Sequence, residues 1–378
     1  MAKTINYQFK LLYALGMIFV LAGHVRNGGI NLFYDWFPPS SFHLMLFMFA
    51  SGYFYDSLYE SKIIAYIWKK VKRLVIPLYL WNSFYGLIVL FTKTYGILHI
   101  GKDFNFNNLI LAPINYGHQF AYNLCGWFIA PLFMVQIYNI LSRKLIKSVF
   151  GGINEWLFLI FNIILGLLGV YLGIHGYNKG WYLPLDRFLL FVPFYEAGIL
   201  YQKQLQDKDY LNNILYFGLI GSITLVLIYR YGGLPTINMG WIKNFKDNNL
   251  FLPFIESILG IAFWLRASRI LTPAIGRSKY INIIADNTWS IMIHQFTGFM
   301  MLKTLFYFIS VYTPFFHNFN VLKFKSDIWY CYIPGGRPQM AILYLIAGII
   351  VPLIIHWGVR KIQMKLTAYK KFEWCAYL

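Results

Sequence analysis

The sequence has few charged residues for its length, and acidic residues are the scarcest. Of its 378 residues, 12% are Asp, Glu, Lys or Arg, only 14 are acidic, and 58% are hydrophobic. A water-soluble core cannot absorb that much apolar surface, so the composition excludes an ordinary soluble protein. A helix needs about 20 mostly apolar residues to cross the hydrocarbon layer of a bilayer. The composition therefore predicts a polytopic membrane protein with the lipid bilayer as its surroundings.

Cysteine is also rare. The three cysteines, Cys125, Cys331 and Cys375, lie far apart and match no metal or redox spacing. We therefore predict neither a disulfide framework nor a metal site. The chain has no clear repeat, low-complexity tract or flexible linker. Residues 1–378 are thus predicted to form a single polytopic membrane domain.

The long apolar runs do not alternate between apolar and polar residues as the strands of a membrane barrel would, so we predict that they are helices. The predicted fold is all-α, with about ten transmembrane helices. They are predicted at residues 9–27, 42–60, 74–93, 122–141, 156–176, 186–202, 211–230, 250–268, 281–301 and 340–359.

The net charge of +19 could indicate nucleic-acid binding, but its distribution favours a membrane topology. The predicted spans place 21 of the 33 Lys and Arg residues on one side of the bilayer. Short basic segments mark the cytoplasmic side, so both termini are predicted to be cytoplasmic and no nucleic-acid partner is expected. The basic residues of 69–73, in a predicted loop, are also dense enough to bind an anionic lipid headgroup or a phosphorylated cofactor.

The longest connections, 94–121, 231–249 and 302–339, are predicted to lie on the outer side. They are rich in Asn, Gly, Tyr and Phe. Aromatic residues at a lipid boundary commonly anchor a protein in the interface. Aromatic faces with amide side chains also suit sugar rings. Both interpretations remain open.

Two histidines occupy the first two predicted spans. His24 is late in the first span, and His43 opens the second. Titratable groups are rare in membrane segments and are functional candidates by default. A hairpin through the bilayer would bring both imidazoles to the same end, which indicates a reaction centre or a proton path.

Other polar residues of the predicted spans gather toward the outer half of the bilayer. Each has a structural alternative: a histidine often bonds neighbouring helices, adjacent acidic and basic residues can form a surface ion pair at a helix start, and small residues can mark a helix contact. A buried carboxylate needs a partner or water. Asp286 and Asn287 are predicted to lie nearer the cytoplasm in the ninth span. The outer candidates are Ser51, Trp127, Asp186, Arg187, Glu256 and His294.

Several of these residues lie in motifs that, taken in order, resemble acyltransferase family 3, integral-membrane enzymes that O-acylate cell-surface glycans. The last motif is similar to the branch that acetylates capsules and exopolysaccharides. In the second motif, Met45 stands where proline is usual. The motifs are Gly23-His24, Phe42–Phe47 running through Ser51-Gly52-Tyr53, Lys72–Pro77, Gly126–Phe133, and Asn287–His294 followed by Phe299 and Lys303.

The resemblance implies transfer of an acetyl group from cytoplasmic acetyl-CoA to a hydroxyl of a cell-surface polysaccharide or its lipid-linked precursor. It implies location in a bacterial plasma (inner) membrane, with acetyl-CoA as a substrate and no bound cofactor. Some members carry a soluble esterase-like extension, and we expect none here.

The resemblance also implies roles for residues. His24 would be the general base, and His43 would orient it, share its proton or donate to the oxyanion. Members usually carry Arg or Lys eleven positions before the first histidine, where this chain has Tyr13. Lys10 lies one helical turn earlier on the same face and could supply the charge. The basic residues expected to bind CoA are Lys10, Lys70, Lys72 and Arg73.

A different class of protein fits part of this pattern. A proton-coupled transporter or flippase of a lipid-linked sugar would also bury His, Asp and Glu. Transporters usually show internal repeats and helices broken at matching places, which this sequence lacks. A non-catalytic subunit of an assembly complex is a third alternative, against which His24, His43 and the basic cluster argue.

Overall fold

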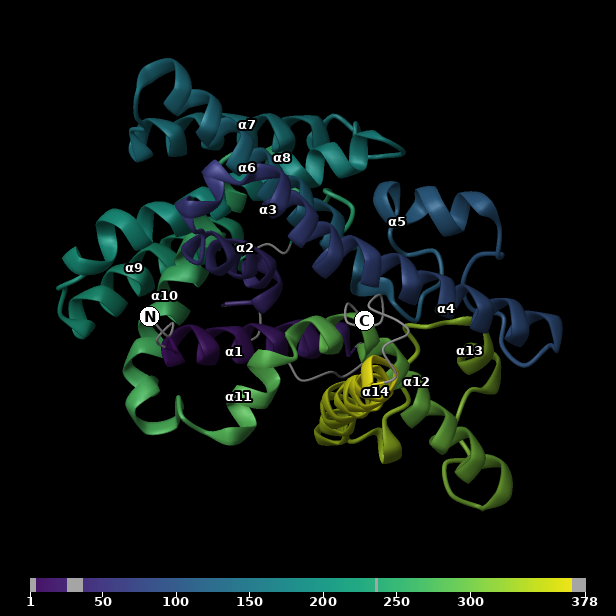
Figure 1. Cartoon of the computed structure of the whole chain (residues 1–378). Coiled ribbons are helices and arrows are strands. Elements are labelled where there is room, and N and C mark those ends of the chain that lie inside the picture. Colours follow the sequence, from purple (N-terminus) through teal and green to yellow (C-terminus); the bar gives the residue numbers. More distant parts are fainter. Residues whose placement is uncertain (1–4, 26–36, 235–236, 369–378) are drawn as a thin grey trace. The chain divides into compact units, whose positions relative to one another are not determined.

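The computed structural model describes residues 5–25, 37–234 and 237–368, which form helices joined by turns and loops (Figure 1). An isolated β-bridge joins Asn238 and Lys243, but the described part of the chain contains no β-strand. The all-α class is therefore confirmed. The α-helices are α1 (Tyr7–His24), α2 (His43–Tyr53), α3 (Ile63–Lys70), α4 (Ile76–Thr94), α5 (Ala112–Asn115), α6 (Ile129–Phe150), α7 (Glu155–Ile174), α8 (Tyr182–Leu200), α9 (Asn213–Tyr231), α10 (Leu252–Ile275), α11 (Lys279–Asp286), α12 (Thr288–Tyr312), α13 (Val321–Ser326) and α14 (Ile342–Ala368).

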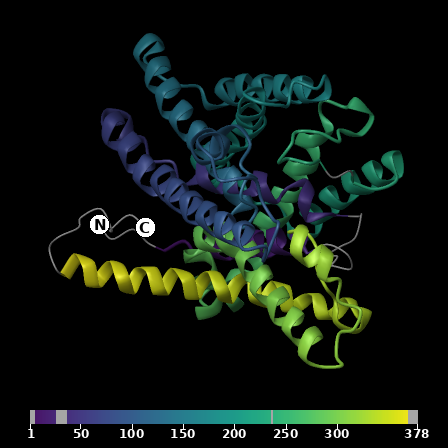
Figure 2. The ribbon, with the colours of Figure 1, turned by 90° about the vertical axis from the view of Figure 1, so that its right-hand side faces the viewer.

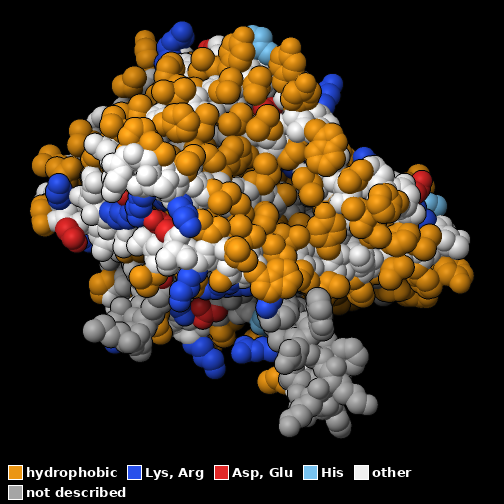
Figure 3. All heavy atoms as spheres, turned by 45° about the horizontal axis from the view of Figure 1, so that its top comes forward, with side chains coloured by type: hydrophobic (Ala, Val, Ile, Leu, Met, Phe, Trp, Pro, Cys, Tyr) orange, Lys and Arg blue, Asp and Glu red, His pale blue; other side chains and the backbone are white. Residues whose placement is uncertain are grey.

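Six helical stretches of the described chain are long and apolar enough to cross a membrane. They carry exposed apolar side chains, such as Leu87, Ile164 and Leu225, which are 54%, 58% and 63% exposed. Hydrophobic side chains cover much of the surface seen in Figure 3. Such a surface suits lipid. The count of about ten spans stays a prediction, and the termini lie outside the described residues. The six stretches are Ile63–Thr94, Leu124–Phe150, Glu155–Ile174, Asn213–Tyr231, Leu252–Ile275 and Pro338–Lys365.

The helix predicted over 42–60 is shorter than expected. It is α-helical over the 11 residues of α2 only, and a 3₁₀ helix at Ser57–Ser61 follows after a break. At 1.5 Å per residue, α2 is about 16 Å long, about half the thickness of the hydrocarbon layer. The chain leaves the helix at Phe54, where Asp56 caps the following turn by accepting a hydrogen bond from the Leu58 N–H.

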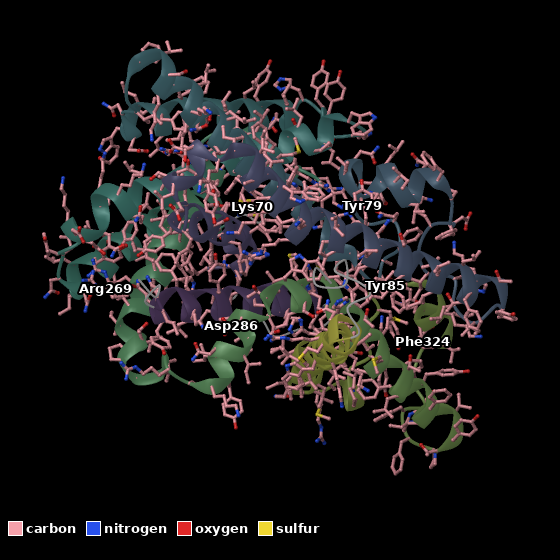
Figure 4. The ribbon with its side chains drawn as sticks, in the orientation of Figure 1. Lys70, Tyr79, Tyr85, Arg269, Asp286 and Phe324 are labelled. Carbon is pink, nitrogen blue, oxygen red and sulfur yellow. The ribbon has the colours of Figure 1, made fainter. Side chains whose placement is uncertain are left out.

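The basic segment predicted as a loop before the third span is helical instead. α3, a π-helical turn at Val71–Val75 and α4 continue directly into one another. Lys70, Tyr79 and Tyr85 follow one another along this stretch (Figure 4). Residues 63–76 contain neither Gly nor Pro, so nothing ends the helix, and Pro77 stands in the first turn of α4, where proline is tolerated.

The ninth predicted span is divided. α11 ends at Asp286, Asn287 has φ −116° and ψ 19°, and α12 begins at Thr288. Asp286 and Asn287 therefore stand at a helix boundary, not within a continuous span as predicted. Asn favours such positions because its side chain competes for backbone hydrogen bonds.

The described residues form two compact units. The first comprises residues of 1–20, 32–69 and 131–286, and the second comprises residues of 21–31, 70–130 and 287–378. Helices α1, α3 and α6 contribute residues to both units.

In the first unit, α2 packs against α8 through glycines. A Cβ atom on Gly52 would lie 1.9 Å from the Tyr195 carbonyl oxygen, and one on Gly198 would lie 2.0 Å from the Phe49 carbonyl oxygen. Only glycine allows this approach of two backbones, which is the small-residue helix contact considered for Ser51-Gly52. Ser51 Oγ also accepts a hydrogen bond from Gln136 Nε2 at 2.9 Å. We therefore place Ser51 in the packing of this unit.

In the second unit, α12 and α14 lie side by side (Figures 1 and 2). A Cβ atom on Gly298 would lie 2.4 Å from the Ala347 carbonyl oxygen, so the two backbones are in close contact there. Ser290 Oγ donates to the Pro352 carbonyl oxygen at 3.0 Å, which adds a side-chain hydrogen bond between the two helices. Of this pair, α12 carries Gln295 and Phe296, two of the residues next to His24.

Candidate functional site

His24 ends α1 and is half-buried in the second unit. Its Nδ1 atom lies 2.9 Å from Oε1 of Gln295 on α12. Gln295 is fully buried, and its Nε2 group donates to the Met292 carbonyl oxygen at 3.1 Å, which fixes the orientation of the amide. Since Oε1 can only accept, Nδ1 of His24 carries the proton. Nε2 is then the nitrogen with the lone pair, as a general base requires.

Apolar rings and a thiol surround this imidazole. The ring centroids of Phe296 and Trp329 lie 5.2 Å and 5.8 Å from that of His24. The Cys125 sulfur is 3.7 Å from Nδ1 and 3.9 Å from Nε2, and its side chain is buried. A site with few polar groups beside the imidazole strengthens the hydrogen bond that His24 Nδ1 donates to Gln295.

His294, adjacent to Gln295 in sequence, has a different environment. Its Nδ1 atom lies 2.7 Å from the Tyr85 hydroxyl, which accepts a hydrogen bond from Thr297 Oγ1, also at 2.7 Å. His294 is 1% exposed and packs edge-on against Trp81. Its contacts join α4 to α12, so it bonds neighbouring helices, as the structural alternative for a lone histidine proposes.

His43 opens α2 in the first unit. Its Nδ1 atom lies 2.6 Å from the Pro39 carbonyl oxygen, which can only accept, so Nδ1 carries the proton here too. His24 and His43 belong to different units. The pairing of the two imidazoles stays a prediction.

Lys10 and Tyr13 lie on α1 in the first unit. Lys10 Nζ is 2.8 Å from Asp286 Oδ2, and the two side chains are 25% and 58% exposed. The Tyr13 ring packs against Phe47 and Phe54, with centroids 5.8 Å and 6.5 Å away. The ring that replaces the usual basic residue is thus part of an aromatic cluster, while Lys10 keeps a partly exposed charge.

The basic residues of the α3–α4 stretch are the other predicted donor contacts. Lys70 ends α3, and Lys72 and Arg73 lie in the π-helical turn. Lys70 and Lys72 are half-buried, and Arg73 is exposed. These three residues belong to the second unit.

Asp186, Arg187 and Glu256 are all fully buried in the first unit. The alternative that Asp186 and Arg187 form an ion pair at the surface is therefore wrong, because both side chains are buried. Arg187 Nε donates to the Gly240 carbonyl oxygen at 3.1 Å and so holds the connection between α9 and α10. The carboxyl groups of Asp186 and Glu256 have no hydrogen-bond partner among the described residues.

Trp127 lies in the connection between α4 and α6, within the 3₁₀ helix Leu124–Phe128. It is 6% exposed, and a Cβ atom on Gly117 would lie 2.2 Å from its Cβ atom. Its ring stacks near His118, with centroids 6.3 Å apart. Trp127 therefore packs against other residues of the same connection and presents little surface to a substrate.

Buried amides fix the same connection. Asn82 Oδ1 accepts from Gln119 Nε2 at 2.5 Å, and Asn108 Nδ2 donates to the Asp103 carbonyl oxygen at 2.8 Å. At the surface, a hydrogen bond from Lys93 lowers the pKa of Asp103 below its usual value. These amides are engaged in holding the chain, which favours a structural part for them.

Sequence reasoning missed Gln295, Cys125 and Trp329 as neighbours of His24. The preference for titratable residues singled out His294, yet adjacent residues of a helix point about 100° apart. Among the described residues, no group of three or more His, Cys, Asp or Glu side chains could hold a metal ion.

A family comparison decides the class of this protein. The model of an acyltransferase domain matches residues 6–359, nearly the whole chain. The chain belongs to acyltransferase family 3. It is a membrane acyltransferase that transfers groups other than aminoacyl groups, with several apolar helices suited to a bilayer. No curated protein and no solved structure matches this acyltransferase.

Proposed function

We propose that this acyltransferase moves an acetyl group from cytoplasmic acetyl-CoA to a hydroxyl of a cell-surface polysaccharide or its lipid-linked precursor, in a bacterial plasma membrane. The observation that carries the proposal is the imidazole of His24. Its Nδ1 proton is committed to Gln295, so that Nε2 has the lone pair. This is the arrangement that a general base for an alcohol needs.

The chemistry requires one proton to move twice. The sugar oxygen attacks the thioester carbonyl carbon while His24 Nε2 takes the hydroxyl proton. The tetrahedral intermediate then breaks its C–S bond, and the imidazolium returns the proton to the departing sulfur of CoA. The products are an acetyl ester and free CoA thiol, and His24 regains its starting state. An imidazole has an ordinary pKa near 6.5, which suits both transfers.

His43 is proposed as a second participant that shares the proton or donates to the oxyanion. Ser51, Trp127, Asp186, Arg187, Glu256 and His294 are proposed as supporting residues. Ser51 and His294 each form a hydrogen bond within their own unit. The other four side chains, Trp127, Asp186, Arg187 and Glu256, are buried.

The donor is proposed to bind with its phosphates near Lys10, Lys70, Lys72 and Arg73, beside Tyr13. No bound cofactor is proposed, since acetyl-CoA is consumed as a substrate. The ion pair of Lys10 with Asp286 is partly exposed. Such a pair contributes little stability, so a phosphate can replace the carboxylate at small cost.

We expect Lys10→Gln to raise the KM for acetyl-CoA about fivefold, the effect of about 1 kcal/mol at an exposed contact, with kcat unchanged. Steady-state kinetics at saturating acceptor measure this. Lys179→Gln removes an exposed lysine elsewhere in the first unit and is the control. Equal KM values for the two variants would remove Lys10 from the donor site.

A thiol-release assay tests the function itself. Purified protein in nanodiscs is mixed with acetyl-CoA and polysaccharide fractions, and free CoA thiol is measured. We expect thiol release that depends on acceptor and an acetyl ester on the glycan. No release with any glycan, together with movement of a lipid-linked sugar across liposomes without acetyl-CoA, would favour the transporter instead.

Gln295 is predicted to position the base. Gln295→Met leaves the Nδ1 proton of His24 without the Gln295 acceptor, which costs about 1–3 kcal/mol, so kcat should fall about tenfold to hundredfold. Gln295→Glu keeps the acceptor and adds a charge that stabilises the imidazolium. When the pH is lowered, the Gln295→Glu variant should therefore lose activity at a higher pH than the wild type does.

The control is Gln339→Met, which alters an exposed residue of the same unit. The acidic limb of the pH–rate profile separates positioning from general damage, because a misfolded fraction lowers the rate equally at every pH. An unchanged limb in Gln295→Glu would refute the role of Gln295.

A further inference from the structure

The connection between α12 and α14 passes beside His24. Trp329 lies in this connection, within the second unit, and its indole is half-buried. Its ring centroid is 5.8 Å from that of His24 and 4.9 Å from that of Phe296. Phe296 is 1% exposed, so Trp329 presents the more accessible aromatic surface next to the imidazole.

A fully buried lysine holds this part of the connection. Lys303 on α12 is 0% exposed, and its Nζ group donates to the carbonyl oxygen of Ile328, the residue before Trp329, at 2.8 Å. Burying an ammonium group is costly unless it is hydrogen-bonded. The bond from Lys303 offsets part of this cost and fixes the backbone at Ile328, next to Trp329.

Further bonds fix the chain on both sides of the indole. The backbone N–H of Trp329 donates to Asp327 Oδ1 at 2.8 Å, and the Tyr344 hydroxyl donates to the Tyr332 carbonyl oxygen at 3.0 Å. The Asn320 N–H donates to the Tyr330 hydroxyl at 2.9 Å. Trp329 is thus held in place from several directions, as a rigid binding surface must be.

We propose that Trp329 is the platform on which a pyranose ring of the acceptor stacks, with one hydroxyl directed at Nε2 of His24. The proposal rests on the function proposed above and names the acceptor-binding surface of that site. A pyranose presents C–H groups on its faces and hydroxyls at its rim. A ring stacked on the indole would therefore place rim hydroxyls beside the neighbouring imidazole.

The position of Trp329 in the sequence agrees with this role. It belongs to the connection 302–339, which the topology prediction places on the outer side. Acetyl-CoA is proposed to arrive from the cytoplasmic side. An acceptor on Trp329 and a donor from the opposite side would then meet at His24.

The test uses the full chain in nanodiscs and a panel of methyl hexopyranosides. Saturation-transfer-difference NMR detects which sugar C–H groups contact the protein, without any need for turnover. We expect a signal with the wild type and Trp329→Phe, and its loss in Trp329→Ala. Trp181→Ala, which removes an indole that is 59% exposed in the first unit, should keep the signal.

Kinetics with the polysaccharide acceptor give a second readout. Trp329→Ala should lower kcat/KM for the acceptor about tenfold to hundredfold, the range that loss of one aromatic stack gives, while the KM for acetyl-CoA is unchanged. Lys303→Met keeps the length of the side chain and removes the bond to Ile328. It should show the same acceptor-specific loss.

The outcomes separate this proposal from the function on which it rests. Acceptor-dependent thiol release with equal kcat/KM in the wild type and Trp329→Ala overturns the platform and leaves the acetyltransferase standing. Sugar signals that vanish in Trp329→Ala, without thiol release, support the platform and overturn the acetyltransferase. Absence of a signal from the wild type with every pyranoside overturns the platform.

Discussion

Replacement of His24 with alanine is expected to lower kcat for acetyl transfer about 10²- to 10⁴-fold, which is the usual contribution of a positioned general base. The expected loss is in kcat because the imidazole acts as the sugar oxygen attacks and as CoA leaves. The KM for acetyl-CoA should stay nearly constant. The measurement is acceptor-dependent release of free CoA thiol at saturating donor.

His175→Ala is the matched control. His175 is an exposed histidine at the end of α7, and its Nδ1 atom lies 2.8 Å from the Tyr171 carbonyl oxygen. Its replacement should leave kcat and KM unchanged. If His24→Ala keeps more than about a tenth of the wild-type kcat, the assignment of His24 as the base is wrong.

Replacement of Arg143 with methionine should give the largest loss of stability. Arg143 is fully buried on α6. Its guanidinium contacts Glu155 through two hydrogen bonds of 3.1 Å and 2.7 Å, and it also contacts Glu196. Its Nε group donates to Asn139 Oδ1 at 3.1 Å. Arg143→Met removes the cation and leaves buried carboxylates, which should cost about 3–5 kcal/mol of the free energy of unfolding.

Unfolding in detergent with increasing SDS measures this loss. Lys203 also contacts Glu155, at 2.6 Å, but its side chain is 31% exposed. Lys203→Met should therefore cost at most about 1 kcal/mol. The double variant Arg143→Met with Glu196→Gln should recover part of the loss, because it removes a buried charge along with its partner. Equal costs for Arg143→Met and Lys203→Met would contradict a buried ionic cluster.

The sequence predicted the helical class because apolar runs of this length need helices in a membrane. The predicted start of the third span was wrong, because the helix there extends beyond the edge of the apolar run. The basic residues of 69–73 lowered the hydropathy there, but no Gly or Pro stood in the way, so the helix continued from Ile63 to Thr94. Hydropathy measures the surroundings of a segment, whereas helix ends depend on breakers and caps.

The site could be predicted only in part. His24 was identified as a titratable group in an apolar run, and the structure places it at the end of α1, half-buried among rings. Its hydrogen-bond partner Gln295 lies 271 positions away in the chain. Depth in a span predicts the height of a residue in the bilayer, but not the face that it presents. The choice between His294 and Gln295 depends on that face.

Trp329 and Lys303 could not be connected to His24 from sequence either. The connection 302–339 contains many aromatic residues, and nothing in its pattern distinguishes Trp329 as the one beside the imidazole. Arg143 lies just after the predicted span 122–141, where a charge count treats it only as a topology signal, yet it is buried between two carboxylates. A charge count predicts sidedness, whereas the pairing of each charge depends on tertiary packing.

Gln295 is predicted to keep one proton on Nδ1 of His24, so that Nε2 accepts the proton of the attacking alcohol. ¹⁵N NMR of the histidine-labelled protein, with His24→Asn subtracted to isolate one of the eight histidines, measures it directly. Above pH 8, we predict that Nδ1 of His24 is protonated and Nε2 is unprotonated, and that this tautomer preference is lost in Gln295→Met. An unprotonated Nδ1 with a protonated Nε2 in the wild type would contradict this tautomer assignment.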